Sequence, residues 1–208
     1  MVQLPQQHNL QDAADRAVLA VRAQPPEQLR WLGARPLAIE SDGTAWVLRV
    51  LGDDLRVELS DGQVVGPDGK KVGPFWRILV LHYLAVASRP EAMAPEVAFA
   101  GLAPTRAYAS TYDRRVTHRL CETAGRDVNS LRRASAALNA LPVQAGDLAF
   151  DLKPLPRVVT RIVWYAGDEE FPPSATMLFP GNIQSFFCSE DIVVLSERIV
   201  SRLGGRPL

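Results

Sequence analysis

Three successive carboxylates, at Asp168, Glu169 and Glu170, form the sharpest chemical feature of this sequence. They follow an apolar segment that ends at Trp164, and they directly precede Phe171. Crowded carboxylates repel one another, so a nearby cation or arginine makes such a group easier to hold together. One interpretation is therefore a hard-metal site or a general acid/base pair. The other is a solvated turn in which one acid caps the next segment, and the spacing alone leaves both open.

A second candidate is His82, which lies beside Tyr83 within the otherwise apolar segment 75–88. An imidazole in apolar surroundings needs a hydrogen-bond partner or must face a cavity. His82 is thus either a core histidine bonded to a strand carbonyl or a ligand-contacting residue in a pocket.

Histidine and cysteine are too sparse to predict a zinc centre. His118 and Cys121 are three residues apart in a predicted helix and share a face, and Cys188 and His82 could complete four ligands. No Cys-x-x-Cys pair is present, however, and free cysteine is often a small buried hydrophobe. We therefore predict no metal site, and the sequence identifies no cofactor.

Basic residues are densest between Arg114 and Arg133. Acidic residues interleave with them, and no glycine-rich phosphate loop accompanies them. The whole chain is also balanced, with 23 Lys and Arg against 23 Asp and Glu, which removes the net attraction used in non-specific nucleic-acid binding. These observations favour a solvated helix face over a nucleic-acid site.

Aromatic residues form the third candidate group, because they could line either the core or a pocket. A flat, conjugated ligand such as a tetrapyrrole would be held by an aromatic wall with charged anchors, for example Arg157 or Arg161. The candidate ligand-binding residues are His82, Tyr83, Tyr108, Arg157, Trp164, Asp168, Glu169, Glu170 and Phe171.

The helices that must position these groups follow from the apolar spacing. Steps of three and four residues predict a surface helix over 12–22, and Pro26 suits the first turn of a short helix that ends at Trp31. The segment 75–88 is apolar nearly all round, which predicts a helix buried between layers. Further helices are expected over 105–124, 129–141 and 189–203; the last is capped by Ser189 and has the inner face Ile192, Leu195, Ile199 and Leu203.

Strand signals occupy the remaining segments. Asp-Gly pairs at 42–43, 61–62 and 68–69 predict hairpin turns, and residues 55–60 alternate strictly between apolar and polar. Residues 157–164 are typical of a strand, with 175–179 as its partner. We therefore predict a single α+β domain over 1–208, with a helical segment at 1–34 and a mostly antiparallel sheet packed against the buried central helix and its flanking helices.

Composition indicates the compartment. Two cysteines are too few for a disulfide framework, which favours a reducing compartment, and the first ten residues lack the regions of a signal peptide. The most apolar stretch, 78–86, is shorter than the roughly 20 residues that a membrane helix needs. We expect a cytoplasmic chain with no membrane partner; its oligomeric state is not readable from the sequence.

Several ordered motifs resemble those of one family. They are Val80-Leu81-His82-Tyr83-Leu84, the spacing of Phe99, Tyr108 and Tyr112, Gly146-Asp147, the run 164–172, Leu178-Phe179 and Ser189-Glu190-Asp191. Over 46–203 the chain resembles the Domain of Unknown Function 3786 family. This resemblance implies a fold and an association with the metabolism of anaerobic bacteria and archaea, but no reaction. A cysteine-rich segment suggestive of an iron–sulfur cluster, found in some relatives, is missing here, and Pro180 stands where an acidic residue usually follows the Leu-Phe pair.

Three functional hypotheses follow. The leading one is a ligand-binding accessory protein of anaerobic cofactor or one-carbon metabolism, with a pocket near His82, Tyr83, Tyr108 and loop 168–171. The second is a metal-dependent enzyme that uses the 168–170 carboxylates. The third is an interaction or assembly module that docks a partner through an exposed apolar surface at 183–187. The first hypothesis requires His82 and the acidic loop to converge on one cavity.

Overall fold

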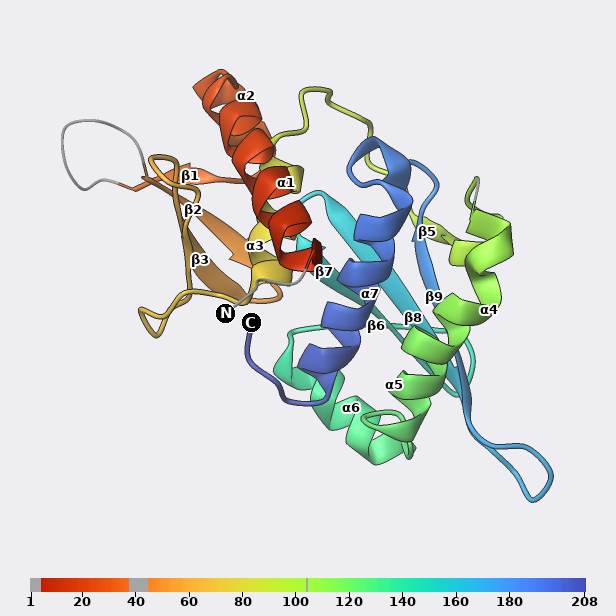
Figure 1. Ribbon diagram of the computed structural model, residues 1–208. Coiled ribbons are helices and arrows are strands. Elements are labelled where there is room, and N and C mark those ends of the chain that lie inside the picture. The colour runs from red at the N-terminus through yellow and green to blue at the C-terminus, as the bar shows by residue number, and fades with distance from the viewer. Residues whose placement is uncertain (1–4, 38–44, 104) are drawn as a thin grey trace.

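A computed structural model describes residues 5–37, 45–103 and 105–208, and it contains two antiparallel sheets (Figure 1). The first sheet consists, in spatial order, of β1 (Arg35–Pro36), β2 (Ala45–Val50), β3 (Asp53–Glu58) and β4 (Val64–Val65). The second consists of β5 (Pro95–Ala98), β9 (Ser174–Pro180), β8 (Val158–Tyr165), β7 (Leu148–Leu155) and β6 (Leu141–Val143). The predicted pairing of the 157–164 and 175–179 segments is confirmed as the β8–β9 hairpin.

The helices lie beside and in front of these sheets (Figure 1). They are α1 (Pro5–Arg22), α2 (Pro26–Trp31), α3 (Pro74–Leu84), α4 (Ala109–Asp113), α5 (Arg119–Glu122), α6 (Val128–Ala137) and α7 (Ser189–Leu203). The π-helical segment Arg114–His118 joins α4 to α5, and 3-10 turns occupy Phe99–Gly101, Thr105–Tyr108 and Ile183–Ser185. In the described residues no helix is both long and apolar enough to span a bilayer.

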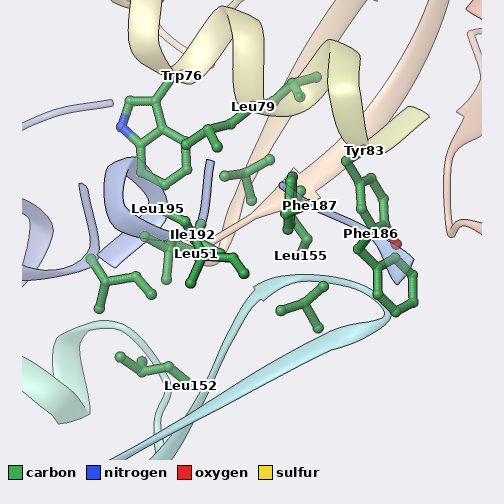
Figure 2. Close-up of a cluster of buried hydrophobic side chains, with 14 of the residues drawn as sticks. Leu51, Trp76, Leu79, Tyr83, Leu152, Leu155, Phe186, Phe187, Ile192 and Leu195 are labelled. Carbon is green, nitrogen blue, oxygen red and sulfur yellow. The ribbon is translucent and has the colours of Figure 1, made fainter. Parts of the chain in front are cut away.

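Helix α3 is the buried central helix that the apolar pattern predicts. Pro74 occupies its first turn, where a missing N–H costs nothing, and most of its side chains are buried. Figure 2 shows Trp76, Leu79 and Tyr83 of α3 near residues of α7, residues of β7 and Leu51 of the β2–β3 turn. The helix ends at Leu84, four residues before the predicted end. One cluster of buried hydrophobic side chains includes residues from α3, α7 and both sheets.

The α+β class and the antiparallel pairing are confirmed, and the strands divide between two sheets. The sheets meet where the N–H of Leu51 donates to the carbonyl of Pro154 at 3.2 Å. Three edge strands contain a proline, at Pro36, Pro95 and Pro142, so each lacks one backbone donor that a further strand would need. These prolines disfavour the addition of a further strand at those three edges.

Two of the three predicted Asp-Gly turns are confirmed. Gly62 and Gly69 adopt φ angles of +66° and +77°, as such turns require. The pair at 42–43 lies outside the described residues. The predicted inner face of the last helix is buried. Ser189 was predicted as its N-cap, but Ser189 is the first helical residue and Cys188 holds the N-cap position.

Candidate functional site

Tyr83, predicted as a ligand-contacting residue, lies fully buried in the core. Its hydroxyl donates to the carbonyl of Leu32 at 2.7 Å and accepts the N–H of Arg157 at 3.1 Å. Burial raises the pKa of this phenol well above its ordinary value, so it stays protonated. The Arg157 guanidinium lies 4.7 Å from the Trp31 ring and donates to the Trp31 carbonyl. Tyr83 therefore connects α3 to the backbone at Leu32 and Arg157, and Arg157 in turn contacts Trp31.

Trp164 is also buried, and its indole N–H donates to the carbonyl of Gly125 at 2.7 Å. It lies near the end of β8, with the acidic loop directly beyond the strand. A shallow hollow of about 440 Å³ is lined by Trp164, Arg126 and the loop. Trp164 and the acidic loop are thus brought together, as the sequence order requires.

Tyr108 lies elsewhere, at the end of the 3-10 turn that precedes α4. Its hydroxyl accepts a hydrogen bond from Arg115 at 2.5 Å, and its ring forms a T-shaped pair with Phe99. Arg115 also pairs with Glu197 at 2.7 Å, so this member of the basic region is neutralised within the chain. Neither His82 nor the acidic loop shares a hydrogen bond with Tyr108 among the described residues.

The acidic loop is built as a turn around Asp168. Its carboxylate accepts the N–H groups of Glu170 at 2.9 Å and Phe171 at 2.8 Å, and its own N–H donates to the Phe171 carbonyl at 2.9 Å. Glu169 and Glu170 are exposed, and Phe171 is 66% exposed. In the described residues no cluster of three histidine, cysteine or acidic side chains could hold a metal ion. The geometry therefore supports the solvated-turn interpretation.

This turn leads to a pH prediction. The two backbone N–H donors lower the pKa of Asp168, so its contribution to the turn persists above its ordinary value of 3.8 and is lost as the pH falls through the lowered value. We expect the amide NMR signals of Glu170 and Phe171 to titrate with a midpoint below 3.8. In Asp168→Asn this step should vanish, whereas in Glu169→Gln it should persist; a midpoint at or above 3.8 in the unmodified protein would contradict the turn's electrostatics.

The expected convergence of His82 and the acidic loop on one cavity is wrong. The two groups line different hollows that share no residue. Tyr83, next to His82, bonds to Arg157 just before β8, whereas Trp164 lies near the other end of that strand. At about 3.3 Å per residue, the eight-residue strand separates these ends by about 23 Å.

His82 instead meets a carboxylate that the sequence pattern did not connect with it. The imidazole Nδ1 lies 3.0 and 2.9 Å from the two carboxylate oxygens of Asp191, in the first turn of α7. Because an ionised carboxylate only accepts, Nδ1 carries the proton in this pair. The other ring nitrogen, Nε2, has no hydrogen-bond partner among the described residues, and the side chain is 30% exposed. The alternative prediction, a core histidine bonded to a strand carbonyl, is also wrong, because the partner is the carboxylate of Asp191.

Cys188 completes the polar contacts of Asp191. Its thiol donates to the same carboxylate at 3.3 Å, and partial desolvation raises the pKa of the thiol. Cys188 and His82 therefore both donate to one acceptor, which is not the arrangement of a thiolate nucleophile and its base. Burial also raises the pKa of the Cys121 thiol, and His118, in the π-helical segment, is exposed.

Residues of α1, α3 and α7, together with Phe186 from the segment before α7, form a shallow hollow of about 430 Å³ at this pair. It is lined by Ala13, Arg16 and Ala17 of α1, by His82, Ala85 and Val86 at the end of α3, and by Phe186 and Asp191. Sequence reasoning missed this role of Asp191, which appeared only as part of the Ser189-Glu190-Asp191 motif. A signal was present, because Asp191 lies four residues before Leu195 and so extends the apolar inner face of α7, where an acid needs a partner.

The exposed apolar surface predicted at 183–187 is not present, because its apolar side chains are buried. Ile183, Phe186 and Phe187 are buried, and the last two lie against the Tyr83 ring with centroids 6.0 and 6.3 Å away. Only the polar residues between them are exposed. This removes the apolar surface on which the assembly-module hypothesis depended.

The family model described as Domain of unknown function (DUF3786) matches residues 33–202. The chain belongs to this family. The predicted resemblance is confirmed, and the match begins earlier than the expected residue 46. No curated protein and no solved structure shows significant similarity to the chain.

Some of the residues that line the hollow lie inside the region matched by the DUF3786 model, and others lie before it. His82, Cys188 and Asp191 lie inside the matched region, so the polar pair belongs to the DUF3786 part of the chain. Helix α1 precedes that region, and it supplies Ala13, Arg16 and Ala17 to the opposite wall.

Proposed function

We propose that this protein is a ligand-binding accessory protein whose ligand contains a metal and binds through Nε2 of His82. One observation carries the proposal: Asp191 fixes the protonated nitrogen of the imidazole, while the other nitrogen is left unbonded at a hollow. A metal-binding histidine commonly donates its second ring N–H to a carboxylate, which orients the ring and makes it a stronger ligand.

The absence of further protein ligands indicates what kind of metal compound would fit. A bare ion needs several side chains, and the described residues contain no such cluster. A metal that arrives inside an organic chelator needs only one ligand from the protein, as a haem iron does. The small residues Ala13, Ala17 and Ala85 line the hollow beside His82.

The metabolic role and the compartment in this proposal rest on the sequence. The resemblance to a family associated with anaerobic metabolism supports a role in anaerobic cofactor or one-carbon metabolism. The low cysteine content supports a cytoplasmic site of action. No observation favours the enzyme hypothesis to the same degree, because the 168–170 carboxylates form a turn and not a ligand set.

The test is a titration with ferric protoporphyrin, followed by the absorption change that accompanies imidazole binding to the iron. We expect the unmodified protein to show this change, His82→Ala to lose it while staying folded, and Asp191→Asn to bind about 10- to 100-fold more weakly. His118→Ala, which changes an exposed histidine outside the hollow, is the matched control and should bind normally.

A second arm uses protein purified without oxygen from its native metabolic setting, with an absorption spectrum and elemental analysis. We expect a coloured, metal-containing preparation. Colourless, metal-free protein, together with identical titrations for the unmodified protein and His82→Ala, would refute the proposal.

A further inference from the structure

The second sheet has two faces, and the strand register assigns each side chain to one of them. Side chains alternate along a strand, and register partners on neighbouring strands point to the same side. Phe150, Ile162 and Met177 are register partners, and all three are buried. Trp164 lies on the same face and bonds to Gly125 after α5, and Figure 1 shows α5 and α7 in front of the sheet. This is therefore the face that the helices cover.

The opposite face is apolar, and much of it is exposed or half-buried. On β8 it carries Val159, Val163 and Tyr165, so this strand is largely apolar on both faces. Such a strand is typical of a sheet that is covered on both sides, whereas a solvated face usually carries polar residues at alternate positions. Tyr165 is 47% exposed. We call this surface the open face; besides Tyr165 its side chains include Leu141, Val143, Ala149, Val163, Thr176 and Leu178.

Two charged residues lie at the centre of the open face and neutralise each other. Arg161 donates to both carboxylate oxygens of Asp151, at 2.7 and 2.9 Å, and the two side chains are 25% and 19% exposed. They belong to one row of register partners across four strands, in the order Leu141, Asp151, Arg161 and Leu178. Read across the sheet, the row is leucine, carboxylate, guanidinium, leucine.

This row is complementary to its own reverse. Suppose that a second copy packs face to face, with a two-fold axis that runs along the strands between Asp151 and Arg161. Each row then lies over the same row in reverse order, so Asp151 of one copy faces Arg161 of the other, and Leu141 faces Leu178. A symmetric dimer interface requires this kind of self-complementary surface.

The neighbouring row fits the same symmetry. It contains Val143, Ala149, Val163 and Thr176, in that order across the sheet. The axis places Ala149 opposite Val163, so that a small side chain meets a larger one, and it places Val143 opposite Thr176. Alternation of small and large side chains lets the facing sides of two sheets interdigitate at a spacing of about 10 Å.

The size of the open face and the chemistry of the sheet edges favour this mode of pairing. Five strands about 4.8 Å apart and eight residues of about 3.3 Å each cover roughly 600 Å² in projection. Accessible surface exceeds projected area, so the face approaches the roughly 800 Å² per partner of a standard interface. Pairing through the edges of the sheet is disfavoured, because Pro95 and Pro142 lie on the edge strands β5 and β6.

We infer that the protein forms a symmetric dimer in which the open faces of two copies pack together, with Asp151 of each copy opposite Arg161 of the other. The inference goes beyond the proposed function and does not depend on it, because His82 lies on α3 and is not part of this sheet.

Analytical ultracentrifugation of the full chain tests the dimer. At about 50 µM we expect twice the mass of the chain, since interfaces of this size have micromolar or tighter dissociation constants. Leu141→Glu should sediment as a monomer with an unchanged circular dichroism spectrum, because it places an unpaired carboxylate opposite Leu178 in the interface. The matched control is Leu19→Glu: Leu19 and Leu141 are both 64% exposed, but Leu19 lies on α1, so this variant should stay dimeric.

Exchange of the charged pair tests the orientation. The double variant Asp151→Arg/Arg161→Asp keeps an ion pair within each chain, and two copies of it again place unlike charges opposite each other. Paired with the unmodified protein, it brings arginine against arginine and carboxylate against carboxylate, which opposes association. Native mass spectrometry of an incubated mixture should show the two homodimers and few mixed dimers. Isotopically labelled and unlabelled unmodified protein should instead mix statistically.

Three results would overturn the inference. One is a monomeric unmodified protein at the concentration of the sedimentation experiment. Another is a dimer that Leu141→Glu leaves intact, since that dimer would use a different surface. The third is free mixing of the exchanged variant with unmodified protein, which would place the charged pair away from the axis. If the exchanged variant does not fold, the comparison of Leu141→Glu with Leu19→Glu decides.

Discussion

Replacing Tyr83 with alanine is expected to destabilise the protein by about 3–5 kcal/mol, as removal of a large buried aromatic side chain typically does. The ring packs between α3 and the segment that carries Phe186 and Phe187, and its hydroxyl joins Leu32 to Arg157. One side chain thus connects four segments that are distant in the sequence.

The milder change Tyr83→Phe isolates the hydroxyl. It keeps the ring but leaves the carbonyl of Leu32 and the N–H of Arg157 without their present partner, which should cost about 1–3 kcal/mol. Urea denaturation monitored by tryptophan fluorescence measures both variants. The matched control is Tyr165→Phe, because Tyr165 is exposed and should change stability by less than about 0.5 kcal/mol. Equal stability of Tyr83→Phe and the unmodified protein would contradict a structural role for this hydroxyl.

The second large effect is expected at Trp164, where alanine should again cost about 3–5 kcal/mol. The indole is buried, and its N–H donates to the carbonyl of Gly125 at the turn after α5. The contact is close: a Cβ atom added at Gly125 would lie 3.3 Å from the indole nitrogen and 3.0 Å from the carbonyl oxygen of Leu120. Trp164 therefore anchors this turn to β8.

Trp164→Phe separates the hydrogen bond from the packing. Since Gly125 would lose the donor for its carbonyl, we expect a loss of about 1–3 kcal/mol, part of which also reflects the smaller ring. Thermal unfolding followed by circular dichroism measures the change. The neighbouring exposed residue gives the control, as Tyr165→Ala removes an aromatic ring one position away on the opposite face of β8. A Trp164→Ala protein as stable as Tyr165→Ala would show that the indole is dispensable to the fold.

These two aromatic residues also test the aromatic-wall interpretation of the sequence. Tyr83 and Trp164 were predicted to contact a ligand, but in the structure each directs its polar atom to a backbone group of the chain. Tyr83→Phe should accordingly bind ferric protoporphyrin at His82 with little change, provided that the protein remains folded. Loss of binding in a folded Tyr83→Phe protein would return this residue to the ligand site.

Local patterns predicted the elements whose signal lies within one turn or one strand. Helix α2 begins at Pro26 and ends at Trp31 as expected, and the inner face of α7 is buried at the predicted positions. Strands β5, β6 and β7 were not predicted. Strands β5 and β6 are short and each contains a proline, and β7 contains Pro154 near its end. Their strand character depends on pairing with neighbours, which a single segment does not reveal.

The amino-acid sequence by itself determined the α+β class, the buried central helix, the family, and the presence of a histidine that needed a polar partner. Only the tertiary structure decided which partner it has. Asp191 is 109 residues away from His82, and no spacing rule connects residues that meet only when α3 packs against α7. The same packing separates His82 from the acidic loop, because the length of β8 lies between them. Side-chain chemistry is encoded locally, whereas the choice of which groups share a site depends on long-range packing of helices and sheets.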